Sequence, residues 1–119
     1  TNNLTDMSFM FWIASNFNQP IGDWDTSTVT NMQEVFKNAS SFDQNISAWN
    51  VSKVNNMIMM FYDATAFNQD LQNWNAPNLP SDQCTDFAIG ADAWLAQYGG
   101  SVAKTPPLST SMINANCGL

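Results

Sequence analysis

The chain has 119 residues, a formal net charge of −7 and no histidine, and 45% of its residues are hydrophobic, which suits one domain with a real core rather than a disordered segment. Three lysines without any arginine are too few cations for a row of phosphates, and no apolar run approaches the roughly 20 residues of a membrane helix, so we expect neither a nucleic-acid partner nor direct membrane insertion. Because histidine is the commonest general base and transition-metal ligand, we also expect no enzyme activity, no cofactor and no metal site.

Three blocks of 25 residues align when the sequence is compared with itself, at 4–28, 29–53 and 54–78. Their shared columns are chemically uniform, and in the second block they include Met32, Phe36, Ala39, Phe42 and Trp49. A degenerate fourth copy spans 79–90, and residues 91–119 are expected to form a C-terminal cap and an extended tail. A unit of this size cannot bury its apolar side alone, so neighbouring units are predicted to stack.

Each block is expected to begin with a short helix, because apolar residues from Met32 to Ala39 recur at i, i+3, i+4 and i+7. The predicted helices span 6–14, 31–39 and 56–64. The next segment of each block has apolar residues four apart with polar residues between them, which predicts a short one-sided strand. The predicted strands span 18–22, 43–47 and 68–72. The expected fold class is therefore an α/β solenoid, a right-handed, leucine-rich-repeat-like coil of short parallel strands and short helices with a C-terminal cap.

The repeat pattern V-T-N-M-x-x-x-F-x-x-A-x-x-F-x-Q-x-I-x-x-W-N-x-S resembles the BspA-like leucine-rich-repeat surface proteins, including the 25-residue repeats of mycoplasma surface lipoproteins. The resemblance covers residues 4 to about 90 and is closest over 29–78. It implies a protein that is extracellular or at the cell surface, often with an adhesive role, and it implies no catalytic residues. The predicted function is a non-catalytic structural or adhesive module of a cell-surface or filament protein, whose partner is another protein or a neighbouring copy of itself.

Cys84 in the degenerate copy and Cys117 in the tail are the only two cysteines. In a chain with surface-protein character we expect them to form one disulfide that closes the end of the stack; the alternative is two separate buried thiols.

Acidic and amide residues recur in two columns of the repeat, starting at Asp6 and at Asp25. We expect these side chains to bond the backbone of turns rather than to hold calcium, because later copies replace the carboxylates by amides. The tryptophan column is expected to fill the core at one corner of each repeat rather than to serve as a ligand platform.

Two other binding functions compete with the protein-interaction hypothesis. An outward amide ladder predicts a carbohydrate-binding module, and its residues are Asn18, Gln19, Asp43, Gln44, Asn68 and Gln69. A threonine ladder for ice binding, starting at Thr26, is weaker because the following copies do not keep threonine. Four N-x-S/T triplets are acceptors for N-glycosylation if the protein is secreted through an endoplasmic reticulum, at Asn3, Asn38, Asn45 and Asn50, with Asn38 and Asn45 the favoured ones.

Large apolar residues stand at positions of the predicted helices that should be polar, namely Phe9, Trp12, Ile13, Ile58, Met59 and Tyr62. Exposed apolar residues of this size indicate an interaction patch, unless the tail or a preceding coil covers them.

The N-terminal end of the array is a second predicted contact surface. The chain starts at Thr1 without an initiator methionine, so we interpret it as a processed chain or a fragment, and no capping sequence precedes Leu4. That end is expected to expose strand edges and apolar columns, at Leu4, Met7, Phe11 and Phe17, which a preceding coil or another copy would cover.

Overall fold

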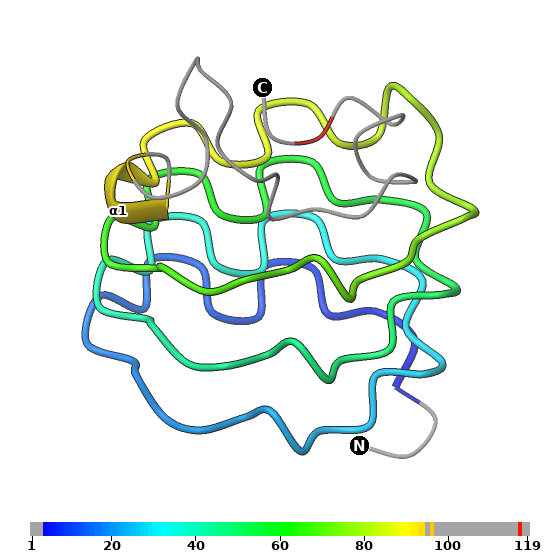
Figure 1. Ribbon diagram of the computed structural model, residues 1–119, viewed down its shortest axis with the longest axis horizontal. Helices are drawn as coiled ribbons and strands as arrows, with labels where there is room; N and C mark the ends of the chain where they lie inside the picture. The colour runs from blue at the N-terminus through cyan, green and yellow to red at the C-terminus, as the bar shows by residue number, and fades with distance from the viewer. Residues whose placement is uncertain (1–3, 95, 97–116, 118–119) are drawn as a thin grey trace.

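The computed structural model describes residues 4–94, 96 and 117, and the chain forms four stacked coils (Figure 1). Coil 1 (residues 4–28), coil 2 (29–53) and coil 3 (54–78) are the three aligned repeats, and coil 4 starts at residue 79. In Figure 1 the coils lie one on another in chain order, from blue at the N-terminus to yellow in coil 4. No helix in the described part of the chain has the length and hydrophobicity needed to cross a bilayer.

The predicted α/β solenoid of parallel strands and short helices is wrong. Over the described residues the structure has one helix, α1 (Asp92–Trp94), and no β-strand. Parallel bridges between described residues are isolated, and they join Asp6 to Asn31 and Asn31 to Asn56. The segments 6–14, 31–39 and 56–64 are mainly runs of turns, and 18–22, 43–47 and 68–72 contain no strand.

Each predicted helix is instead a ribbon of overlapping β-turns. In coil 1 the N–H groups of Met10, Trp12 and Ala14 donate to carbonyls three residues earlier, at 3.0–3.1 Å. The residues between them donate to the next coil, as Phe11 does to the carbonyl of Val35 at 2.9 Å. In an α-helix, the Phe11 N–H would bond within its own coil, four residues back.

Left-handed backbone conformations make a continuous helix impossible in these segments. In coil 1, Phe9 and Ile13 have φ angles of 61° and 57°, far from the helical region. The same pair of positions has positive φ in every later coil, at Glu34 and Asn38, at Met59 and Asp63, and at Asp86 and Gly90. The ribbon of turns is therefore a repeated feature of the fold.

A ladder of backbone hydrogen bonds joins each coil to the next. The donors of coil 1 are the N–H groups of Met7, Phe9, Phe11 and Ile13, and their acceptors in coil 2 are the carbonyls of Asn31, Gln33, Val35 and Lys37. The junctions of coil 2 with coil 3 and of coil 3 with coil 4 have the same four bonds, and all twelve are 2.7–3.0 Å long. Each coil thus donates N–H groups to the coil that follows it and offers carbonyls, its acceptor row, to the coil that precedes it.

The predicted apolar columns form the core. Phe36 is fully buried, and its ring stacks on Phe61 of the next coil at 5.4 Å and on Phe42 of its own coil at 4.1 Å. Trp49 and Trp74 form a parallel column at 6.3 Å. The sequence pattern therefore predicted correctly which columns are buried in coils 2 and 3, although it assigned them to the wrong secondary structure.

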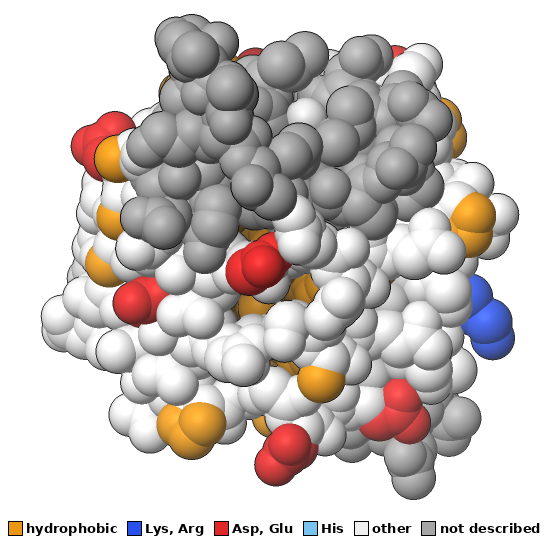
Figure 2. All heavy atoms as spheres, viewed as in Figure 1, with side chains coloured by type: hydrophobic (Ala, Val, Ile, Leu, Met, Phe, Trp, Pro, Cys, Tyr) orange, Lys and Arg blue, Asp and Glu red, His pale blue; other side chains and the backbone are white. Residues whose placement is uncertain are grey.

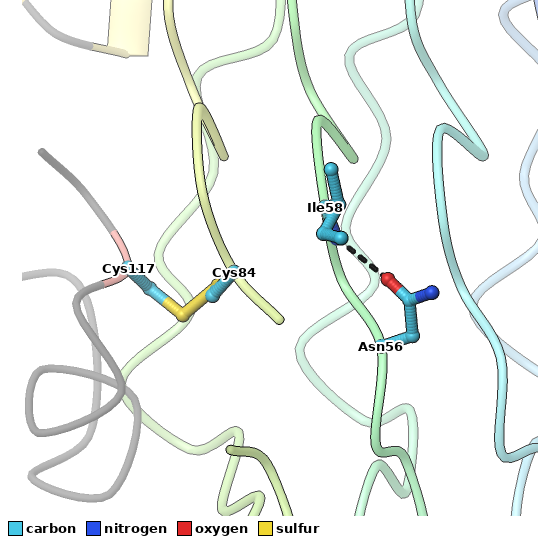
Figure 3. The surroundings of a disulfide bond; sticks show 4 residues. All are labelled: Asn56, Ile58, Cys84 and Cys117. Atoms are coloured by element: carbon cyan, nitrogen blue, oxygen red, sulfur yellow. Dashed lines mark hydrogen bonds between the residues drawn. A yellow bond between two sulfur atoms is a disulfide. The ribbon is translucent and has the colours of Figure 1, made fainter. Parts of the chain in front are cut away.

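The predicted disulfide between Cys84 and Cys117 is present, with the two Cα atoms 5.2 Å apart (Figure 3). Both cysteines are buried at coil 4, so the bond fixes residue 117 against the last coil. The rest of the predicted tail, at 95, 97–116 and 118–119, lies outside the described residues.

Candidate functional site

The acidic and amide columns bond the backbone of their own turns, as predicted. The Asp6 carboxylate accepts hydrogen bonds from the Ser8 N–H at 2.8 Å and from the Ser8 hydroxyl at 2.6 Å. Asn56 repeats the arrangement in coil 3, where its Oδ1 accepts the Ile58 N–H at 3.0 Å (Figure 3). These side chains are therefore structural caps of turns.

Two carboxylates of these columns have lowered pKa values. The hydroxyl of Ser8, and next its N–H, stabilise the charged form of Asp6 and lower its pKa from the usual 3.8. The hydroxyl and N–H of Ser27 lower the pKa of Asp25 in the same way. Among the described residues, no group of three or more His, Cys, Asp or Glu side chains is arranged to hold a metal ion.

The predicted carbohydrate ladder is occupied by bonds between coils. The Asn18 Oδ1 accepts the Asp43 N–H at 2.9 Å and the side-chain amide of Gln44 at 2.9 Å. One coil further, the Asp43 carboxylate accepts the Asn68 N–H at 3.0 Å and the side-chain amide of Gln69 at 2.7 Å. These polar side chains replace the backbone ladder of the strands that the sequence predicted at this face.

Gln19, the remaining residue of that set, is exposed. The first residue of the threonine ladder is buried, and the Thr26 hydroxyl donates to the carbonyl of Asn50 at 3.0 Å. The tryptophan column also lies in the core, as predicted, with the indole N–H of Trp49 donating to the carbonyl of Ile21 at 2.9 Å.

The six residues of the predicted interaction patch do not form one apolar surface. Phe9, Trp12 and Ile13 in coil 1 are 48–52% exposed, whereas Ile58, Met59 and Tyr62 in coil 3 are only partly exposed. Coil 2 separates the two groups with an ion pair of 3.2 Å between Lys37 and Glu34. The Lys37 ammonium also lies 5.2 Å from the centre of the Tyr62 ring. Phe9, Trp12 and Ile13 of coil 1 are therefore the more exposed part of the predicted patch.

The open side of coil 1 is a continuation of this apolar surface that sequence reasoning only partly located. Met10 is 40% exposed, although it occupies the column of Val35 and Met60, both fully buried. Phe11 and Phe17 are partly buried, as expected for an end coil, but Met7 is fully buried. The only signal for Met10 was its place in the first copy, because its spacing is that of a core residue.

The predicted glycosylation sites differ in accessibility. Asn45 and Asn50 are exposed, and their Oδ1 atoms accept N–H groups two residues later. Asn38 has a positive φ of 61°, and its Oδ1 is buried with no hydrogen-bond partner among the described residues. Asn3 lies outside the described residues. Of the two acceptors favoured from sequence, Asn45 is the more accessible.

A family model described as "Mycoplasma protein of unknown function, DUF285" matches residues 1–93. The match supports a mycoplasma-type repeat family that is surface-associated, but it does not support the BspA-like leucine-rich repeat specifically. No curated protein and no solved structure matches the chain.

Proposed function

Since the chain belongs to the DUF285 family, we propose that it is a non-catalytic repeat module of an extracellular or cell-surface protein, acting as a structural or adhesive protein-interaction element. The observation that carries this proposal is the exposure of Phe9, Trp12 and Ile13 together on coil 1. Single exposed apolar side chains are common on protein surfaces, but a group of large ones marks a contact site for another molecule.

The rest of the described surface suits a stable spacer. Charged residues make up 11% of the chain, and the part of the face in Figure 2 that is not grey is mostly uncharged polar groups and backbone, with scattered acidic and hydrophobic side chains. Polar side chains bond one coil to the next, as Asn18 does when it accepts the Asp43 N–H and Asp43 when it accepts the Asn68 N–H. A rigid stack of this kind holds an exposed apolar group at a fixed position without needing a large hydrophobic surface.

The proposal includes the absence of nucleic-acid partners and of direct membrane insertion. It is supported by the charge of −7 and by the use of Lys37, one of three cations, in an ion pair with Glu34. Binding to phosphate backbones depends on several cations, and this chain has only three in its sequence.

Adhesion of beads coated with the chain to cultured epithelial cells tests the proposal. We expect adhesion that is lost when the cells are treated with protease and that falls when Trp12 is replaced by Ser. The matched control is Ile89→Ser, which removes a side chain of comparable exposure, 42% against 50%, on coil 4. Loss of adhesion after glycosidase treatment instead of protease treatment would support the carbohydrate-binding alternative, and no adhesion at all would contradict both.

A further inference from the structure

The outer side of coil 4, which faces away from coil 3, carries a row of hydrogen-bond donors. In coil 3 each ladder donor directly follows a ladder acceptor in the sequence, as Met57 follows Asn56. The same positions of coil 4 form its donor row, the N–H groups of Cys84, Asp86, Ala88 and Gly90. None of these four N–H groups donates to a described residue. An edge of unpaired N–H groups is a template on which another chain can pair, and proteins commonly cover such an edge.

The apolar residues of coil 4 are covered on this outer side. Phe87 follows Phe61 in its column and is fully buried. Trp94, in the column of Phe67, is 1% exposed. At the other end of the stack, Phe11 is only partly buried. A coil at the end of a stack exposes such side chains unless something lies on it, so the outer side of coil 4 has a cover.

Cys117 is part of that cover. Cys84 continues the methionine column, whose member in coil 3, Met57, is fully buried. The sulfur of Cys84 is bonded to Cys117, which is 4% exposed and has its Cα atom 5.2 Å from that of Cys84. In Figure 3, Cys117 lies on the side of Cys84 away from Asn56 and Ile58 of coil 3. Cys117 therefore has the place that the methionine of a following coil would have.

We infer that the Cys84–Cys117 disulfide is a redox-controlled latch on the donor row of coil 4. The bond is attached to the first residue of the row, and while it is intact it holds Cys117 on the outer side of the coil. A dithiol opens the latch by thiol–disulfide exchange: the two sulfurs of the reductant are oxidised to a disulfide, and Cys84 and Cys117 each gain one electron and one proton. Residue 117 is then no longer held, and the outer side of coil 4 opens to solvent.

The effect of opening is expected to stay at this end of the stack. In a stack of repeats each coil contacts only its neighbours, so the loss of one contact acts first on the adjacent coil. The N–H groups of Met57 and Phe61 donate to carbonyls of coil 4, at 2.7 and 2.8 Å. The N–H of Phe36 donates to coil 3, one junction further from the disulfide. Loosening of coil 4 therefore frees the first two amides before the third.

Amide hydrogen exchange of the full chain, before and after reduction with dithiothreitol, tests the latch. Exchange at Met57 and Phe61 should become at least about tenfold faster on reduction, while exchange at Phe36 should change by about twofold or less. Removal of the reductant and re-oxidation should restore the original rates, because a latch closes again. Unchanged rates at Met57 and Phe61, an equal increase at Phe36, or rates that do not recover would overturn the inference.

Two variants separate the latch from other effects of the reductant. The Cys84→Ser, Cys117→Ser chain should exchange like the reduced parent chain and should not respond to dithiothreitol. The Cys117→Ser chain keeps the Cys84 thiol, which is fully buried beneath Cys117 in the parent. A maleimide should label this thiol without denaturant, because its cover has been released. Labelling that requires denaturant would show that Cys117 does not control access to coil 4.

Discussion

The indole N–H of Trp74 donates a hydrogen bond to the carbonyl of Ile46 in the preceding coil, at 2.9 Å, while the ring itself is fully buried. The ring fills the core, and its one polar group, the indole N–H, finds an acceptor in a carbonyl that also receives the Trp49 N–H at 3.0 Å. Trp49 makes the same bond to Ile21, so this pairing is part of the repeat. It explains why the corner position is tryptophan rather than another large apolar residue.

Replacing Trp74 by Phe should lower the free energy of unfolding by about 2 kcal/mol, because the indole bond to the Ile46 carbonyl is lost, leaving that carbonyl with the Trp49 N–H, and the ring becomes smaller. Urea denaturation followed by circular dichroism measures this loss. The control is Trp12→Phe, at a side chain that is 50% exposed, where we expect little change. Equal losses in the two variants would show that the Trp74 bond contributes nothing.

Replacing Ile13 by Asn should stabilise the chain. Ile13 is a β-branched residue at φ 57° with a side chain that is 52% exposed, and the same position of coil 2 is Asn38 at φ 61°. Since Asn tolerates the left-handed region better, the free energy of unfolding should rise by about 1 kcal/mol. Ile89→Asn, at an exposed residue that has no positive φ, is the control and should give no such rise. A destabilised Ile13→Asn chain would argue against the turn ribbon in coil 1.

The free energy of unfolding should decrease as the pH is lowered through the range in which Asp6 and Asp25 become protonated. Both carboxyl groups have pKa values lowered from 3.8 by their serine partners in the folded chain. As the pH is lowered, these groups therefore become protonated in the unfolded chain before they do so in the folded chain. The stabilisation is complete above the unfolded pKa and is lost as pH falls through the folded pKa. Asp25→Asn, the residue that coil 2 has at this position, should therefore lose less stability between about pH 5 and pH 2 than the parent chain. Thermal melts across this range measure the difference, and parallel curves would contradict it.

The Cys84–Cys117 disulfide should stabilise coil 4. The bond links residues 33 positions apart, so its removal should cost on the order of 3 to 4 kcal/mol. Urea denaturation of the Cys84→Ser, Cys117→Ser double variant measures this cost. Intact mass before and after reduction and alkylation checks the bond itself, and two thiols that alkylate freely in the native protein would exclude it.

The burial pattern could be predicted from the sequence because it depends on side-chain chemistry at a fixed period. The positions of Phe36 and Trp49 are phenylalanine and tryptophan in all three copies, and residues that repeat this closely are the ones that stack. The cysteine pair was also predictable, because only one pairing exists for Cys84 and Cys117.

The secondary structure could not be predicted because two backbones satisfy the same spacing. Apolar residues at i, i+3, i+4 and i+7 lie on one side of a helix, and from Met32 to Ala39 they also lie on one side of a ribbon of turns. What decides between them is the positive φ at Glu34 and Asn38, and neither residue is a glycine that would have indicated it. The hydrogen bonds that stabilise these positive φ angles run to the next coil, to residues that are remote in sequence.

The backbone of coil 4 also differs from what the side-chain pattern indicates. The positive-φ pair at Met59 and Asp63 recurs at Asp86 and Gly90, 27 positions later, whereas the earlier coils repeat every 25. Two residues are therefore inserted within coil 4, after Leu79, whose N–H bond to Ala76 still follows the 25-residue period. Phe87 still packs against Phe61, with ring centres 5.3 Å apart, so side-chain similarity concealed the shift of the backbone.

Scalar coupling across the hydrogen bond of the Phe36 amide, measured by NMR on the isotopically labelled chain, tests the central claim that each coil donates a row of N–H groups to the next. We predict a coupling between the Phe36 nitrogen and the carbonyl carbon of Met60, whose oxygen is 2.9 Å away in coil 3. A coupling to the carbonyl of Met32, four residues earlier, would be the sign of an α-helix and would contradict the stacked ribbon of turns.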